Sequence, residues 1–392
     1  MKIITRTVWI LSLVSLFTDV ASEMLYPVMP VYLKEIGFSI LLIGILEGFA
    51  EAIAGLSKSY FGKLSDVSGK RLPFVRLGYL LSAISKPMMA VFIYPLWIFF
   101  SRTIDRIGKG LRTAARDAML SDEATPQTKG RVFGLHRAMD TLGAVIGPAI
   151  ALLYLYFYPG NYKTLFYIAF IPGILAIAFT FLIRERKRST QKVDLKSVSS
   201  FSFVHYWKES PPSYKKLVIG LLAFSFINSS DVFLLLKVKE AGLDDTSVIG
   251  VYIFYNLIYA LAAYPIGRLS DRIGFKSTFI IGLLLFAVVY TGMAFANQLY
   301  LFFILFFLYG LYAAATESIA KAWISNISER KDTATAIGTY TGFQSVATML
   351  ASALAGWIWF TFSAGAPFLF SGITTLLIIV YVMVIIPKPN PH

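Results

Sequence analysis

Long apolar segments recur along the whole sequence and constrain its fold more than any other feature. Each is about 20 residues long, which is enough for a helix to cross the ~30 Å hydrocarbon core of a bilayer. Short polar turns separate them, and twelve such segments can be counted in the 392 residues. The composition agrees, because 57% of the residues are hydrophobic and only 15% are charged. The sequence therefore predicts an all-α membrane protein with 12 transmembrane helices and almost no β-sheet.

The predicted helices are separated by short turns except at one place. They cover residues 7–33, 40–61, 73–93, 96–120, 130–157, 164–184, 214–237, 247–267, 276–296, 299–325, 334–360 and 365–386. The one long connection begins with a strongly basic run and contains Ser-rich and Pro-Pro stretches. We expect an N-terminal six-helix bundle at 1–184, a cytoplasmic linker at 185–213 and a C-terminal six-helix bundle at 214–392.

The distribution of cations predicts the orientation in the membrane. The net charge is +14, and 23 Lys and Arg fall in the turns assigned to one side, against four in the opposite turns. Cytoplasmic loops carry such an excess, so both termini are expected in the cytoplasm and the bilayer, rather than a nucleic acid, is the expected partner. We expect a bacterial inner (plasma) membrane, a monomer, and no cofactor or metal. Cysteine is absent, which excludes disulfides and thiolate metal sites.

A charged motif is written twice, at the same place in each half. Residues 61–71 read FGKLSDVSGKR and residues 266–276 read IGRLSDRIGFK. Both lie between the second and third helix of a half. A weaker echo pairs residues 129–148 with 333–352, at the start of the fifth helix of each half. Two copies of a six-helix unit explain the duplication.

These motifs carry a family resemblance. Gly62, Asp66, Gly69 and Arg71, and again Gly267, Asp271, Gly274 and Lys276, fit the loop signature G-x-x-x-D-x-x-G-x-[RK] of the major facilitator superfamily. The segments FTDVASEMLYPVMP, DRIGKGLRTAARDAML and KGRVFGLHRAMDTLGAVIGP resemble a widespread group of prokaryotic permeases whose substrates are mostly unassigned. The resemblance implies two pseudo-symmetric bundles and transport by alternating access, but it names no cargo.

The resemblance also implies a role for the repeated motif, a latch on the cytoplasmic side. The glycines allow close helix approach. Asp66 is expected at the start of the eleventh helix, near residues 333–335, and Asp271 at the start of the fifth, near 128–130, where helix N-termini favour an anion. Arg112 and Arg116 are assigned to this latch or to snorkelling. The alternative is that each motif is only a tight turn.

Acidic residues within the predicted helices are candidates for proton coupling, because a carboxylate inside the membrane needs a proton, a partner or a wet cavity. The candidates are Asp19, Glu23, Glu47, Glu51 and Asp140. Asp19 and Glu23 fall on one polar stripe of the first helix, near mid-membrane. The alternative is permanent pairing with Arg102 or Arg106.

The fourth helix carries the densest charge. Arg102 and Arg106 lie at its deeper end, and a guanidinium there would clamp a carboxylate or phosphate of cargo, or serve as counterion to neighbouring acids. Arg106 to Gly110 approximates a family signature (R-x-x-x-G) whose arginine is associated with proton coupling. Gly143, Gly147 and Pro148 match the start of an antiporter signature, or they simply allow close packing and bend the helix.

The remaining substrate-binding candidates are mostly neutral or aromatic. They are Tyr26, Asn228, Tyr252, Tyr255, Asn256, Tyr259, Tyr312, Glu317 and Gln344. Tyrosine and asparagine offer stacking and hydrogen bonds without a fixed charge, which suits a partly apolar organic ligand. Ordinary helix packing is the alternative.

The sequence therefore predicts a secondary active transporter, proton-coupled, that moves a small organic solute with a preference for an anionic one. The alternative is a multidrug/proton antiporter that exports amphipathic or cationic drugs. An enzyme is not expected, because no HExxH, GxSxG, P-loop or Cys/His cluster is present.

Overall fold

The computed structural model describes residues 4–26, 28–38, 40–185, 202–243 and 245–386. Within these ranges the side chains of residues 30, 31, 34, 40–45, 47–52, 56, 202–204, 245, 246 and 249 are left undescribed. The described part is helical and contains no β-strand. Eight of its helices are long and apolar enough to cross a membrane.

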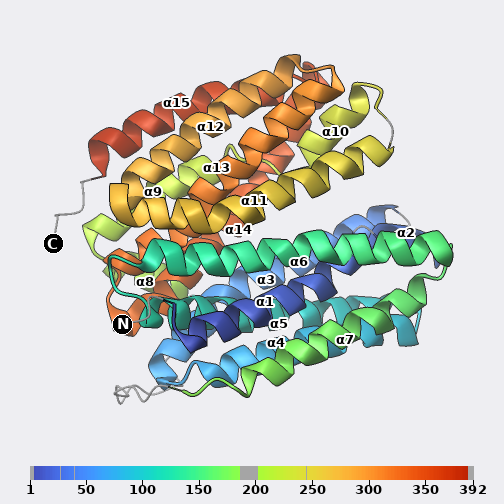
Figure 1. Cartoon of the computed structure of the whole chain (residues 1–392), viewed down its shortest axis with the longest axis horizontal. Coiled ribbons are helices and arrows are strands. Elements are labelled where there is room, and N and C mark those ends of the chain that lie inside the picture. The colour runs from blue at the N-terminus through green and yellow to red at the C-terminus, as the bar shows by residue number, and fades with distance from the viewer. Residues whose placement is uncertain (1–3, 27, 39, 186–201, 244, 387–392) are drawn as a thin grey trace. The chain divides into compact units, whose positions relative to one another are not determined.

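The chain divides into two compact units (Figure 1). Unit 1 comprises Met1–Glu123, Met139–Lys208 and Glu329–Gly342, and unit 2 comprises Ala124–Ala138, Glu209–Ser328 and Phe343–His392. The fifth helix of each half, predicted at 130–157 and 334–360, is therefore divided. Its first part belongs to one unit and the rest of it to the other. The predicted boundaries at residues 184 and 214 divide the chain by its order in sequence rather than by contacts. They stay a prediction.

The helices of the first half agree in order with the predicted spans. They are α1 (Arg6–Leu25), α2 (Met29–Glu35), α3 (Ile40–Ser68), α4 (Leu72–Val91), α5 (Pro95–Glu123), α6 (Lys129–Phe157) and α7 (Tyr162–Thr180), with α8 (Ser202–Glu209) in the connection. In unit 1, α4 and α3 pack on α5, and α7 packs on α1 and α4.

The second half repeats this order. Its helices are α9 (Pro212–Ser225), α10 (Val232–Glu240), α11 (Asp245–Ile273), α12 (Phe275–Phe295), α13 (Leu299–Ile327), the 3₁₀ turn η2 (Arg330–Asp332), α14 (Thr333–Thr361) and α15 (Ala366–Ile385). In unit 2, α13 packs on α11 and α12, and α15 packs on α12 and α9.

The first predicted span of each half is interrupted rather than continuous. In place of 7–33 the chain forms α1 and α2, and in place of 214–237 it forms α9 and α10. In the second break, Asn, Ser and Asp side chains compete with helical hydrogen bonding. The freed backbone groups find other partners: the Ser371 hydroxyl donates to the Ile227 carbonyl at 2.7 Å, and the Ser230 amide donates to the Ser352 hydroxyl at 3.1 Å. The break is therefore built into the core of unit 2.

The repeated motif is more helical than predicted. The second helix of each half continues through it, so α3 ends at Ser68 and α11 at Ile273. Gly69 and Gly274 then adopt positive φ angles of 66° and 89°. A left-handed residue terminates a helix, and glycine takes this conformation without steric cost. The two motif glycines at these positions therefore mark the helix ends.

Close approach of α1 and α6 in unit 1 generates a stability prediction. A Cβ atom on Gly147 would lie 2.7 Å from the Val20 carbonyl oxygen and from the Met24 amide nitrogen, whereas one on Gly250 of α11 would meet nothing within 4 Å. We expect Gly147→Ala to lower the melting temperature of the detergent-solubilised protein. Alanine favours a helix over glycine by about 0.5–1 kcal/mol, so Gly250→Ala should leave the melting temperature unchanged or raised. Equal shifts for the two variants would contradict the packing described.

Candidate functional site

A charged cavity lies within unit 1, between α1, α4 and α5. Its volume is about 150 Å³. Three acids and five cations line it: Asp19, Glu23 and Asp105, with Lys86, Arg102, Arg106, Lys109 and Arg112. Tyr26 also lines the cavity, so the structure brings together five of the predicted coupling and substrate-binding residues: Asp19, Glu23, Tyr26, Arg102 and Arg106. Among the described residues, no group of His, Cys, Asp and Glu could hold a metal ion.

The α5 sequence explains why so many cations face one cavity. Arg102, Arg106, Lys109 and Arg112 follow one another at intervals of three or four residues, which places them on one helix face. The backbones of α4 and α5 meet at a pair of glycines, because a Cβ atom on Gly108 would lie 2.6 Å from the Gly78 carbonyl oxygen. This crossing brings the polar face of α4 against α5.

Asp105 is neutralised inside this crossing. Its Oδ1 atom accepts hydrogen bonds from the Ser82 hydroxyl at 2.6 Å and the Lys86 ammonium at 2.8 Å. Arg102 Nη1 lies 3.7 Å from Oδ2. Asp105 and Lys86 are both buried. Lys86 and Arg102 therefore both contribute to balancing the charge of Asp105.

Arg112, for which the sequence predicts a latch or snorkelling role, is among the residues that line the cavity. Only 6% of the residue is exposed, and its guanidinium carbon lies 4.8 Å from the centre of the Tyr79 ring. Its Nε and Nη1 atoms have no hydrogen-bond acceptor among the described residues. Buried donors are nearly always satisfied in folded proteins, so these two are available to an anionic ligand.

A second set of acids adjoins the cavity at the contact between α1 and α6. The Asp19 carboxyl lies within electrostatic range of the carboxyls of Asp140 and Glu23. The Ser15 hydroxyl donates to Asp140 and accepts from Arg116 Nη1 at 3.2 Å. Arg116, assigned to the latch with Arg112, is thus buried in this chain of contacts. The Glu47 and Glu51 side chains lie outside the described residues.

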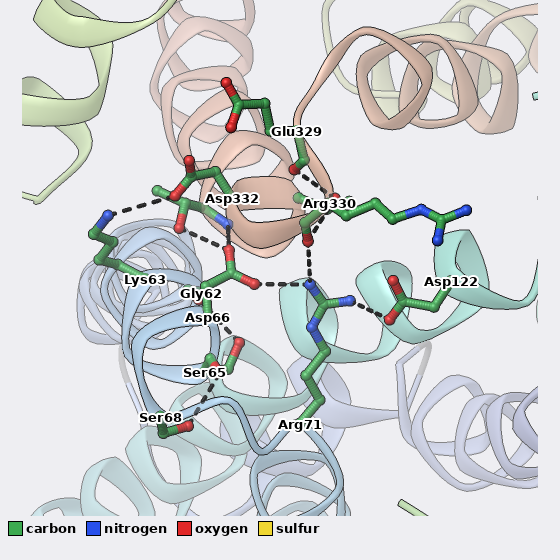
Figure 2. A network of polar contacts seen from close by, with 12 residues as sticks. Gly62, Lys63, Ser65, Asp66, Ser68, Arg71, Asp122, Glu329, Arg330 and Asp332 are labelled. Atoms are coloured by element: carbon green, nitrogen blue, oxygen red, sulfur yellow. Dashed lines mark hydrogen bonds and ion pairs between the residues drawn. The ribbon is translucent and has the colours of Figure 1, made fainter. Parts of the chain in front are cut away.

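The first copy of the repeated motif forms a buried polar network in unit 1 (Figure 2). Asp66 Oδ2 accepts hydrogen bonds from the Thr335 amide at 2.7 Å and the Thr335 hydroxyl at 2.8 Å, at the start of α14. Gly62 permits this approach, since a Cβ atom there would lie 2.6 Å from the Ala334 carbonyl oxygen. Asp66 therefore occupies the helix N-terminus at which the family pattern puts it.

Arg71 ties this network together (Figure 2). Its guanidinium donates to Asp66 at 2.8 Å and to Asp122 at 2.6 Å, and only 1% of the residue is exposed. Glu185 accepts the amides of Arg71 and Leu72, which caps the start of α4. Burial lowers the pKa of the Arg71 guanidinium, while the Asp66 carboxylate raises it. Arginine keeps its charge at any physiological pH, so the ion pairs persist.

The second copy makes the corresponding helix contact in unit 2. Asp271 accepts hydrogen bonds from the backbone amides of Gly130 and Arg131 at 2.7 and 3.1 Å, and Arg131 Nε donates to it at 2.8 Å. The basic residue of the motif behaves differently here. Lys276, which corresponds to Arg71, donates to the carbonyls of Met383 and Ile386 at the end of α15. The two copies therefore share the acid but not its counterion.

Unit 2 gathers several of the neutral and aromatic candidates. The Asn228 amide donates to the Tyr312 hydroxyl at 2.9 Å, and the Tyr252 and Tyr255 rings lie 5.9 Å apart. Glu317 accepts from Tyr259 at 2.9 Å and pairs with Arg137 of α6.

Asn256 and Gln344 are the two other candidates in unit 2. Asn256 is buried and donates to the Tyr252 carbonyl at 3.0 Å, and Gln344 is half-buried on α14.

Four charged residues of the polar clusters in units 1 and 2 were given no role from the sequence. Lys86 and Asp105 pair in unit 1, Arg137 pairs in unit 2, and Asp231 accepts hydrogen bonds from two tyrosines. The only available signal was that each is a charged residue inside a predicted helix. Which neighbour compensates each charge depends on how the helices pack.

Comparisons with known proteins agree with this architecture. A sequence model of the Major Facilitator Superfamily matches residues 11–256 and 232–392. An uncharacterised MFS-type transporter of Methanocaldococcus jannaschii is 31% identical over 362 residues, covering 91% of this chain and 89% of the relative. The quinolone resistance protein NorA of Staphylococcus aureus is 28% identical over 211 residues, covering 52% of each chain. The crystal structure of the E. coli fucose:proton symporter superimposes with a TM-score of 0.80 at 12% identity, covering 99% of this chain and 100% of the symporter.

The fold is thus that of a multi-pass membrane protein with 12 transmembrane helices in two pseudo-symmetric bundles, as predicted. The chain belongs to the Major Facilitator Superfamily. Proteins of this family are in general transporters of small molecules rather than enzymes.

The difference between the two motif copies generates a second prediction. Arg71→Ala leaves Asp66 and Asp122 without their buried counterion, and breaking a buried pair costs about 3–5 kcal/mol. Lys276→Ala removes hydrogen bonds to carbonyls at a less buried site, where the cost is about 0–1.5 kcal/mol. We expect a clearly larger drop in melting temperature for Arg71→Ala in the same detergent. A larger drop for Lys276→Ala would show that the network in Figure 2 does not stabilise unit 1.

Proposed function

We propose that the protein is a secondary active transporter that moves a small organic solute carrying an anionic group, and that it couples transport to protons. The observation that carries the proposal is the excess of cations in the unit 1 cavity. A cavity of about 150 Å³ accommodates part of a small ligand rather than a macromolecule.

The anionic preference follows from the charge balance of that cavity. Five cations and three acids are among the described residues that line it. Three of these cations are arginines, whose planar donors match a carboxylate or phosphate in bidentate geometry. The two unsatisfied donors of Arg112 supply hydrogen bonds that a bound anion would accept. The arrangement therefore favours an anion over a neutral or cationic group.

Uptake by Arg102→Gln tests this preference. Hydrogen bonds to charged groups contribute about 1.5–3 kcal/mol, so we expect the apparent affinity for an organic anion to fall about tenfold or more in proteoliposomes. The matched control is Arg76→Gln, because Arg76 lies on α4 but contacts Phe181 rather than the cavity. An exporter of cationic drugs should keep its affinity for the drug in both variants. Unchanged affinity for the transported solute in Arg102→Gln would therefore refute the anionic proposal.

Proton coupling is supported by the acids between α1 and α6. Asp19 lies within electrostatic range of Asp140, and two neighbouring carboxyl groups repel one another when both are ionised, which favours binding of a proton by one of them. Their helices are held close at Gly143, where a Cβ atom would lie 2.8 Å from Asp19 Cβ. Loss of the proton would place two like charges side by side, so proton occupancy and the α1–α6 contact are linked.

Replacing Asp140 tests the coupling. Asp140→Asn removes one titratable group while keeping a hydrogen-bond partner for Ser15. We expect uptake driven by an imposed pH gradient to be lost, whereas exchange of labelled for unlabelled solute, which needs no net proton movement, should continue. Glu35→Gln at the exposed end of α2 is the control and should retain both activities. Gradient-driven uptake in Asp140→Asn equal to the native rate would overturn this assignment.

Multidrug export by proton antiport is the second candidate function. It is favoured by the similarity over 211 residues to NorA, a quinolone resistance protein, and by the Gly143, Gly147 and Pro148 signature. The glycines are also required for helix packing, which weakens the signature as evidence for export. The same proteoliposome panel, extended to cationic drugs, distinguishes the two functions.

The motif clusters and the orientation complete the proposal. The Asp66 and Asp271 contacts would stabilise one state of an alternating-access cycle, because a contact made in one state alone shifts the equilibrium toward it. The excess of Lys and Arg in one set of turns supports cytoplasmic termini. A bacterial inner membrane and a monomeric transporter remain part of the same proposal.

A further inference from the structure

Asp231 in unit 2 is a carboxylate that only neutral groups hold. It lies in the break between α9 and α10. The Tyr309 hydroxyl donates to Oδ1 at 2.7 Å, and the Tyr255 hydroxyl donates to Oδ2 at 2.8 Å. Each carboxyl oxygen therefore lies within hydrogen-bond distance of one tyrosine hydroxyl.

Asp231 has no ion-pair partner among the described residues. Arg137, the cation that influences it, already pairs with Glu317 and donates to Tyr259 at 2.5 Å. An ionised carboxylate inside a membrane protein calls for a cation, and within the described part of unit 2 the protein supplies two hydroxyl groups instead. Within the described residues no cation balances Asp231, so a cation or a proton from outside them has to do so.

Aromatic rings surround this carboxylate. The Tyr309 ring lies 5.2 Å from the Tyr255 ring, 5.1 Å from the Tyr312 ring and 6.4 Å from the Tyr290 ring, measured between ring centres. Aromatic faces attract ammonium groups, and cages of this kind recognise amines and quaternary ammonium ligands. Asp231 itself remains partly exposed, unlike the buried tyrosines. The residue is therefore not fully enclosed by the described part of unit 2.

We propose that Asp231 and the tyrosines around it bind an organic ammonium group, so that the cargo carries a protonated amine in addition to the anionic group inferred above. This inference rests on the proposed transport function and names a second chemical feature of the cargo. The carboxylate provides the charge, the two hydroxyls fix its orientation, and the rings provide the walls.

Binding to the purified full-length protein tests the inference independently of transport. The probes are a series of primary and quaternary ammonium compounds from methyl to phenylethyl, each compared with the neutral alcohol and the carboxylate of the same size, titrated by calorimetry at neutral pH. We expect at least one ammonium compound to bind more tightly than its alcohol, and Asp231→Asn to weaken that binding about tenfold or more. Binding of the carboxylates should be unchanged in this variant.

Three further variants serve as controls. Glu240→Gln removes another acid of unit 2, one that pairs with Lys237, and should leave ammonium binding intact. Tyr309→Phe keeps the ring, loses one hydroxyl and should retain most of the binding, whereas Tyr309→Leu should lose it. Melting temperatures report whether each variant is folded.

Several outcomes would overturn the inference. One is that no ammonium compound binds better than its alcohol, and another is that Asp231→Asn binds the compounds as tightly as the native protein. A third is that Asp231→Asn keeps ammonium binding but loses the response of uptake to a pH gradient, which would make Asp231 a proton site. Failure of the transport proposal would look different, because uptake would be absent while ammonium binding remained.

Discussion

A charge in a hydrocarbon interior must be compensated by the protein itself, and this requirement organises both units. In unit 1 Lys86 of α4 pairs with Asp105 of α5, and carboxyls of α1 line the same cavity as the cations of α5. In unit 2 the pair of Arg137 and Glu317 meets the same need. The bilayer removes water as a partner, so each charged side chain either has a neighbour or leaves a functional deficit. The donors of Arg112 and the carboxylate of Asp231 are such deficits, with opposite sign.

Helix order and the motif contacts could be predicted because they depend on local or repeated signals. Apolar segment length located the spans, and the family pattern put Asp66 and Asp271 at two helix starts. The breaks that follow α1 and α9 were missed, because hydropathy averaged over a span does not register a short interruption. The contact of Arg112 with the cavity depends on the crossing of α4 and α5 at Gly78 and Gly108, which position along α5 does not reveal. Charge pairing across helices depends on packing that a single sequence does not contain.

The repeated motif shows which parts of a duplicated element are tied to backbone geometry. Both copies keep a glycine where helices approach, an acid at a helix start and a glycine with positive φ at the helix end. No other residue satisfies these positions without steric cost or an unsatisfied helix end. The basic position carries no such backbone constraint, and there the copies have diverged from a buried ion pair at Arg71 to carbonyl contacts at Lys276.

The pairing of Lys86 with Asp105 has a consequence for how the cavity responds to its surroundings. Once that pair cancels, most of the surplus positive potential comes from guanidinium groups, which do not lose their protons in proteins. Attraction for an anion would then stay nearly constant as the compartments on either side change in acidity. Any dependence on acidity would then come from the carboxyls at the contact between α1 and α6. The arginines would supply a positive charge that does not change with pH, and the carboxyls a negative charge that does.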